Sequence, residues 1–196
     1  MTETEPPPAD PAGPRTTGED RLPGDPTVTE TLARMIRVDH AGEYGAVRIY
    51  EGQLAVLGDS PAAPAIREMA AQERDHLARF DALVNDRRVR PTALTPVWHL
   101  GGYLLGAATA LMGEKAAMAC TVAVEEVIDD HYAEQAARLG ADEAELKETI
   151  EAFRADELAH RDTGLAHGAL DAPGYDILSG AVKTASRVAI WLSTRI

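Results

Sequence analysis

Residues 73–76 of this chain read Glu-Arg-Asp-His, and residues 157–160 read Glu-Leu-Ala-His. In each stretch a glutamate precedes a histidine by three positions, and on an α-helix this spacing places both side chains on one face, one turn apart. A carboxylate and an imidazole in this arrangement can bind one metal ion together. One such pair arises easily by chance, whereas two pairs in one chain are a much stronger indication of a metal site.

Each pair is preceded by a further glutamate, about one helical hairpin upstream. Glu43 lies 30 residues before Glu73, and Glu125 lies 32 residues before Glu157. The chain therefore contains two copies of one unit, a helix with a glutamate followed by a helix with Glu-x-x-His. When two such hairpins pack together, four carboxylates and two imidazoles converge inside the bundle, which is the di-iron arrangement of ferritin-like proteins. We therefore predict an all-α fold, a ferritin-like four-helix bundle.

The chemistry of these residues favours two iron ions as the bound metals. Four carboxylates balance two divalent cations, whereas four bare carboxylates in a core would have a prohibitive desolvation cost. Oxygen and nitrogen ligands suit iron or manganese, and a single cysteine, Cys120, cannot form a structural zinc site. Iron is preferred because the expected chemistry needs a redox metal. The predicted ligands are Glu43, Glu73, His76, Glu125, Glu157 and His160.

Other polar residues near the predicted ligands leave alternatives open. Glu126 competes with Glu125 as a ligand, and Glu125 is preferred because it directly follows a run of small and apolar residues. His40, one turn before the first predicted ligand, could hydrogen-bond a ligand or make an ordinary polar contact. His131 and Tyr132 follow Glu125 by six and seven residues, near the same helix face. We predict a catalytic role for them, beside the substrate or in a proton relay.

The helices follow from apolar residues that recur at three- and four-residue spacing from Thr29 onward. Three long helices are predicted over about 29–58, 64–88 and 116–139. A fourth is predicted to reach about residue 168, with Asp142 as its N-cap and Glu145 three residues later. Together with the additional helices they form one domain over 28–196. Residues 1–27 hold seven of the twelve prolines and predict a disordered acidic tail.

Two additional helices are predicted besides these four. Residues 97–112 carry no charge and are rich in glycine and alanine, but a membrane span needs about 20 apolar residues. This segment, about 95–113, therefore predicts either a helix that lies in a membrane interface or a core helix that packs closely through its glycines. The second additional helix, over about 174–194, is amphipathic, and its few charges are mostly basic.

Composition limits the partners and the location. The net charge of −13 and the pI near 4.8 argue against nucleic acid, whose binding rests on clustered lysine and arginine. The first eight residues carry no basic region and no apolar run, so we expect neither a secretory nor a transit peptide. The protein is therefore expected to remain in the cytoplasm.

Longer strings resemble one family, the demethoxyubiquinone hydroxylases of ubiquinone biosynthesis. The resemblance covers about residues 31–196 and is far more specific than the ligand spacing alone, and all six predicted ligand positions agree with it. It rests on DHAGEYGA at 39–46, QERDHL at 72–77, RVRPT at 88–92, AMACTVAVEE at 117–126 and DELAH at 156–160.

This resemblance implies a di-iron monooxygenase that uses O2 to hydroxylate the ring of a polyprenyl demethoxyubiquinol, 2-polyprenyl-3-methyl-6-methoxy-1,4-benzoquinol. It implies that Glu73 and Glu157 bridge the two irons. Two electrons must come from outside the centre, and either an external reductant, such as NADH, or the quinol itself could supply them. The lipid-soluble quinol implies a peripheral protein on the cytoplasmic side of the cell membrane, with residues 97–112 at the membrane surface. An accessory ubiquinone-biosynthesis protein and a homo-oligomer are further partners that it suggests.

Two other functions stay open on the sequence. A ferritin-like ferroxidase or iron-storage protein uses similar ligand spacing, although it needs no membrane-facing segment. A membrane-surface interaction protein could use the same metals only to hold its bundle together, in which case the site would be inert toward redox partners.

Overall fold

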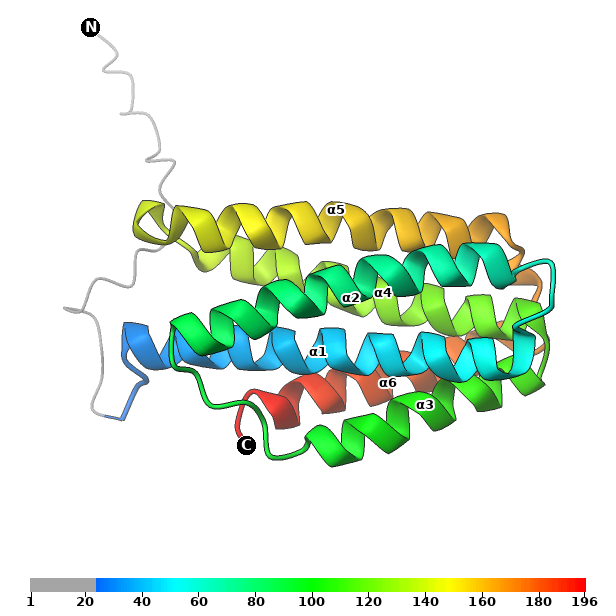
Figure 1. Ribbon diagram of the computed structural model, residues 1–196, viewed down its shortest axis with the longest axis horizontal. Coiled ribbons are helices and arrows are strands. Elements are labelled where there is room, and N and C mark those ends of the chain that lie inside the picture. Colours follow the sequence, from blue (N-terminus) through cyan, green and yellow to red (C-terminus); the bar gives the residue numbers. More distant parts are fainter. Residues whose placement is uncertain (1–23) are drawn as a thin grey trace, which may run out of the picture.

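The computed structural model describes residues 24–196, in which long helices lie roughly parallel and antiparallel to one another (Figure 1). This part of the chain contains no strand, so the all-α prediction is confirmed. Residues 1–23 of the predicted tail lie outside the described residues. The helices are α1 (Val28–Leu57), α2 (Ala63–Asp86), α3 (Thr95–Leu111), α4 (Glu114–Arg138), α5 (Ala144–Ala166) and α6 (Tyr175–Ser193), with short 3-10 helices at Ala141–Glu143 and Ala169–Asp171.

α1 begins with a capping box that our sequence analysis did not identify. The hydroxyl of Thr27 accepts a hydrogen bond from the Glu30 amide at 3.1 Å, and the Glu30 carboxylate accepts one from the Thr27 amide at 2.7 Å. These two bonds satisfy amide groups that have no partner within the helix. The first helical turn is thereby held in place, and α1 continues for 30 residues through the centre of the molecule.

The capping role predicted for Asp142 is wrong. Residues Ala141–Glu143 form a 3-10 helix, so Asp142 lies within that turn, and Glu143 occupies the N-cap position of α5 without a capping bond from its side chain. The Glu143 carboxylate instead contacts the guanidinium of Arg87, at the end of α2, at 2.8 Å. The Glu143 side chain therefore makes a contact between hairpins, which local sequence cannot reveal, and does not cap the helix.

The four-helix core consists of the hairpin α1–α2 packed against the hairpin α4–α5 (Figure 1). Buried apolar side chains fill this core on both sides of its middle. One cluster includes Ile36, Phe80, Leu146 and Ile150, and the other includes Ile66, Met69, Met118 and Val122. The middle of the bundle, where the predicted ligands lie, is thus closed off by apolar packing along the helix axes.

α3 and α6 lie outside this core, with α3 against α1 and α6 against α4 (Figure 1). The backbones of α1 and α3 approach so closely that a Cβ atom at Gly106 would overlap the carbonyl oxygen of Ile49, and one at Gly52 would overlap that of Tyr103. Only glycine permits this approach. The opposite side of α3 exposes apolar side chains, including Leu100 at 59 %. Both features anticipated for residues 97–112, glycine packing and an exposed apolar face, therefore coexist.

None of the helices in the described residues is long and apolar enough to cross a membrane.

Candidate metal centre

The structure brings all six predicted ligands together in the middle of the bundle. α1 and α2 contribute one triad, α4 and α5 contribute the other, and no side chain of the six is more than slightly exposed. Their candidate ligand atoms form two groups, each within 4.8 Å. Glu73 and Glu157 belong to both groups, as bridging ligands would. The first group is Glu43, Glu73, His76 and Glu157, and the second is Glu73, Glu125, Glu157 and His160.

Both imidazoles turn Nδ1 toward this centre. His76 Nδ1 lies 3.6 Å from Glu43 Oε2 and 3.2 Å from Glu157 Oε1. His160 Nδ1 lies 3.1 Å from Glu73 Oε1 and 3.3 Å from Glu157 Oε2. Glu157 therefore sits between the two rings, with one oxygen toward each.

The outer nitrogen of each ring is hydrogen-bonded to the opposite hairpin. His76 Nε2 lies 3.1 Å from Asp156 Oδ2, and His160 Nε2 lies 2.8 Å from Gln72 Oε1. Such outer bonds fix the orientation and the tautomer of a metal-binding histidine. From the sequence, no role was assigned to Gln72 or Asp156. Their position directly before the two glutamates that belong to both groups was the available signal.

Two buried tyrosines hold the remaining carboxylates. The hydroxyl of Tyr50 donates to Glu125 Oε1 at 2.8 Å, and the hydroxyl of Tyr132 donates to Glu43 Oε1. Tyr132 had been predicted to lie near the site, and the structure places it there. Tyr50 was missed, although it follows Glu43 by the same seven residues that separate Tyr132 from Glu125.

The electrostatics of the cluster reflect crowded carboxyl groups away from water. Burial raises the pKa of Glu73 well above its usual value, and the neighbouring Glu157 raises it further; burial likewise raises the pKa of Glu43 and Glu125. Burial also opposes ionisation of Glu157, but its contacts with both histidines outweigh burial and lower its pKa to about 2. Burial lowers the pKa of His76, yet contacts with Glu157 and Glu43 raise it to about 10. The cluster therefore needs positive charge.

Apart from the contacts among these side chains given above, eight of their buried polar atoms lack a hydrogen-bond partner: one oxygen each of Glu43 and Glu125, both oxygens of Glu73 and Glu157, and Nδ1 of both histidines. Buried polar atoms without partners are rare in native proteins, because each has lost its hydration without compensation. Here they all face one centre. Oxygen and imidazole ligands in this number fit two divalent cations of the iron or manganese type.

The structure also decides between the alternatives around the ligands. Glu125 lies in the cluster, whereas Glu126 points away and pairs with Lys183 of α6 at 2.5 Å. His40 Nε2 contacts Asp81 Oδ1 at 3.0 Å, so His40 makes an ordinary polar contact between α1 and α2. Neither Glu126 nor His40 reaches the centre.

His131 lies outside the ligand cluster, in a polar network that sequence analysis did not predict. Its Nε2 lies 3.3 Å from Asp39 Oδ1, and the Gln135 amide donates to the same oxygen at 2.8 Å. Asp39 is fully buried, which raises its pKa. His131 and Gln135 also line a surface cavity of about 200 Å³. Asp39 lies one helical turn before Glu43, so the network connects this cavity with the surroundings of the cluster.

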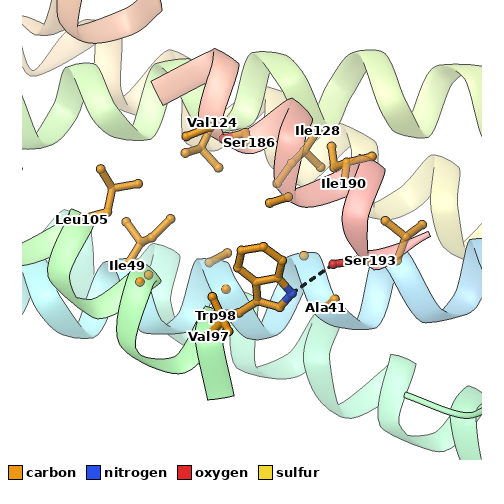
Figure 2. A pocket seen from close by; sticks show the side chains of 18 residues that line it. Ala41, Ile49, Val97, Trp98, Leu105, Val124, Ile128, Ser186, Ile190 and Ser193 are labelled. Atoms are coloured by element: carbon orange, nitrogen blue, oxygen red, sulfur yellow. Dashed lines mark hydrogen bonds between the residues drawn. The ribbon is translucent and has the colours of Figure 1, made fainter. Parts of the chain in front are cut away.

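A larger apolar cavity, of about 320 Å³, lies between α1, α3, α4 and α6. Figure 2 shows the indole of Trp98 lying across it, and the indole nitrogen donates to Ser193 Oγ of α6 at 3.0 Å. Gly42 and Val124 also line it, and each directly precedes a predicted ligand. The cavity therefore runs beside the helix segments that carry Glu43 and Glu125.

Exposed apolar side chains also occur on α3 and α6, two of the helices that form this cavity. Val97 lines the cavity and is 53 % exposed. On α6, Val188 and Trp191 are about half exposed, and Ile177 is 81 % exposed. Apolar groups this exposed, on two neighbouring helices, indicate a surface that contacts lipid or another protein.

Comparison with known proteins matches residues 30–193 to the family described as Ubiquinone biosynthesis protein COQ7. The chain is 60 % identical to the 3-demethoxyubiquinol 3-hydroxylase of Rhodospirillum rubrum, over 93 % of this chain and 86 % of that protein. It is 52 % identical to the mitochondrial NADPH-dependent 3-demethoxyubiquinone 3-hydroxylase of Homo sapiens, over 83 % and 77 %. It is 43 % identical to the mitochondrial 5-demethoxyubiquinone hydroxylase of Saccharomyces cerevisiae, over 84 % and 78 %.

Proposed function

Because this chain belongs to the ubiquinone biosynthesis protein COQ7 family and is, like its relatives, a demethoxyubiquinol hydroxylase, we propose that its buried Glu–His cluster is the di-iron centre of that reaction. The proposal rests on one observation above all. Six side chains from four helices form two ligand groups that share two glutamates, and eight of their polar atoms have no other partner. Family membership favours this function over an iron-storage protein or ferroxidase.

Each half of the centre would hold one iron ion, with Glu43 and His76 on one side, Glu125 and His160 on the other, and Glu73 and Glu157 between them. Two iron ions bound there would supply the redox chemistry by which one atom of O2 enters the quinol ring while the other leaves as water, with two electrons and two protons supplied from outside the centre. The protein positions the ligands: Tyr50 and Tyr132 orient the terminal carboxylates, and the outer bonds of both histidines orient the rings.

The apolar cavity is the proposed substrate site. Its lining is almost entirely hydrocarbon and glycine, which suits a polyprenyl quinol, because burying apolar surface contributes about 25 cal/mol per Å². A quinol ring at its inner end would lie against the α1 and α4 backbone that carries Glu43 and Glu125. The prenyl tail would leave past Val97 and Trp98, where apolar residues become exposed. The same packing excludes water from the reacting ring.

His131 and Tyr132 are proposed to move and hold protons beside the centre. His131 borders the smaller surface cavity and contacts the buried Asp39, so it can pass protons between solvent and the interior. The Tyr132 hydroxyl donates a hydrogen bond to Glu43 and so holds that carboxylate in one orientation. We propose these roles as a proton route that begins at the smaller cavity, which borders the apolar cavity at Val38.

The exposed apolar residues of α3 and α6 are the proposed membrane contact. Val97 lines the substrate cavity, and the other exposed apolar residues lie on α3 and α6, which form two of its walls, so a lipid-soluble quinol would pass from the bilayer into the protein without crossing water. We therefore propose a peripheral protein, on the cytoplasmic side of the cell membrane. Several relatives are named NADPH-dependent, and we extend a reduced nicotinamide as electron donor to this chain. An accessory biosynthetic protein would dock on the same face.

The proposal is tested by loading the protein anaerobically with two equivalents of Fe²⁺, and then adding a short-chain demethoxyubiquinol, a reduced nicotinamide and ¹⁸O₂. The expected product carries one ¹⁸O atom on its ring, as measured by mass spectrometry. Glu157→Gln should abolish both product and stoichiometric iron binding. The control is Glu126→Gln, which changes the carboxylate next to Glu125 on α4 and should retain both. Iron oxidation without any hydroxylated quinol would support a ferroxidase instead.

A further inference from the structure

The residues around the candidate metal centre repeat with the same two-fold pattern as the ligands. Tyr50 follows Glu43 on α1 by seven residues and donates to Glu125 on α4. Tyr132 follows Glu125 by seven residues and donates to Glu43. The two hairpins therefore exchange equivalent hydrogen bonds, and the two halves of the centre have matching tyrosines.

The outer partners of the two histidines occupy equivalent positions but differ in charge. Gln72 and Asp156 each directly precede a bridging glutamate, and each contacts the histidine of the other hairpin. With Nδ1 facing the metal, Nε2 carries the proton and donates it outward. His76 then donates to a carboxylate, whereas His160 donates to a neutral amide. This is a difference between two otherwise matched halves.

A second difference lies in the same half. Asp39 and Thr121 each lie four residues before a predicted ligand, and each is contacted by a glutamine ten residues after the ligand of the facing helix. Gln135 donates to Asp39 at 2.8 Å, and Gln53 donates to Thr121 at 3.3 Å. Again the half that contains Glu43 has the carboxyl group, and the other half has a neutral side chain.

We propose that Asp156 makes the two metal positions unequal, so that the position with Glu43 and His76 binds its ion more tightly than the position with Glu125 and His160. The inference rests on the proposed metal centre. A carboxylate that accepts the Nε2 proton increases the electron density that the imidazole offers through Nδ1, and a neutral amide does so less. Asp156 acts through His76, so it is a positioning residue and not a ligand.

Two isosteric substitutions test this from opposite directions. Asp156→Asn leaves an acceptor oxygen but removes its charge, and Gln72→Glu adds a charge at the matched position. The Asp156 side chain is 45 % exposed, so its replacement leaves the bundle core intact. Asp75→Asn is the control, because Asp75 is an exposed carboxylate beside His76 in sequence and neither histidine hydrogen-bonds to it.

The measurement is a stepwise anaerobic titration of each metal-free protein with Fe²⁺, followed by calorimetry, without quinol or oxygen. The wild-type chain should bind two ions in two resolved steps. Asp156→Asn should weaken the tighter step by about 10- to 100-fold, the usual effect of losing an outer-shell partner, and bring the two constants together. Gln72→Glu should bring them together by strengthening the weaker step. Asp75→Asn should leave both constants unchanged.

Mössbauer spectra of protein loaded with one equivalent of ⁵⁷Fe²⁺ give an independent reading. One quadrupole doublet should dominate in the wild type, and two comparable doublets should occur in Asp156→Asn. Equal wild-type constants, or an Asp156→Asn variant that weakens both steps alike or neither, would overturn the inference while leaving the metal centre standing. A wild-type protein that takes up fewer than two ions would instead overturn the proposed centre itself.

Discussion

Replacing Gly106 by alanine should separate α3 from α1 without disturbing the metal centre. A Cβ atom at this position would lie 2.8 Å from the carbonyl carbon of Ile49 and would overlap its carbonyl oxygen. Carbon atoms in contact prefer about 3.5–4.0 Å, so α3 must move outward by at least about 0.7 Å. Overpacking of this kind has a typical cost of about 1–3 kcal/mol of unfolding free energy.

The shift also acts on function, because α1 and α3 form two walls of the apolar cavity. We expect KM for a short-chain demethoxyubiquinol to rise, with iron stoichiometry unchanged, since all six proposed ligands lie on other helices or on the inner face of α1. Urea unfolding and steady-state kinetics measure the two effects. Gly180→Ala is the control, because a Cβ atom in that outer helix meets nothing within 4 Å. If Gly106→Ala were as stable as this control and kept the wild-type KM, the close α1–α3 contact would be refuted as the element that shapes the cavity.

Three further predictions address the proton route, the charge of the centre and the membrane face. Tyr132→Phe removes the hydroxyl that holds Glu43, and should lower kcat of hydroxylation while calorimetry still detects two bound Fe²⁺; an unchanged kcat would exclude a role for the hydroxyl. In the metal-free protein the pKa of carboxyl groups such as Glu73 is raised, so their contribution to stability is complete below about pH 4.5 and is lost as the pH rises. The pKa of His76 is raised from 6.5 to about 10, so its contribution is lost as the pH rises through that range. The urea concentration at the unfolding midpoint of the metal-free protein should therefore decrease as the pH is raised from 5 to 9, and added Mn²⁺ should restore it at the alkaline end. A midpoint that increases with pH would contradict the direction of these pKa shifts. Ile177→Glu combined with Trp191→Glu should abolish co-sedimentation with anionic phospholipid vesicles but retain hydroxylation of a water-soluble quinol, and unchanged sedimentation would place the membrane contact elsewhere.

The sequence alone was sufficient to predict the four-helix core and the six residues that converge in it. Helical periodicity is local: the three-residue spacing of Glu73 and His76 determines that both side chains share one face, whatever that face packs against. Repetition of the same unit around Glu125 and Glu157 then predicted that two such faces meet. Apolar flanks on the same helices indicated that the meeting point is buried, as the structure confirms.

For the apolar segment over 97–112, composition could not decide between a membrane-facing helix and a core helix. In the structure Gly102 and Gly106 lie against α1, and Leu100 and Leu104 point outward, so one face packs through its glycines and the membrane contact of the other face stays a proposal. Hydropathy averages over both faces of a helix, so it cannot show that one face of a segment packs against another helix while the opposite face is exposed. The separation of faces appears only when a neighbouring helix is in place.

Only the tertiary structure decided which residues support the ligands. Asp156 and His76 are 80 residues apart, and Tyr132 and Glu43 are 89 apart, so no local pattern pairs them. For the same reason, the sequence could not show that Asp142 does not cap α5 or that Glu126 pairs with Lys183. Periodicity along one helix determines the face on which a side chain lies. Its partner depends on the axial shift and rotation of the helices against one another, which the packing of the whole core sets.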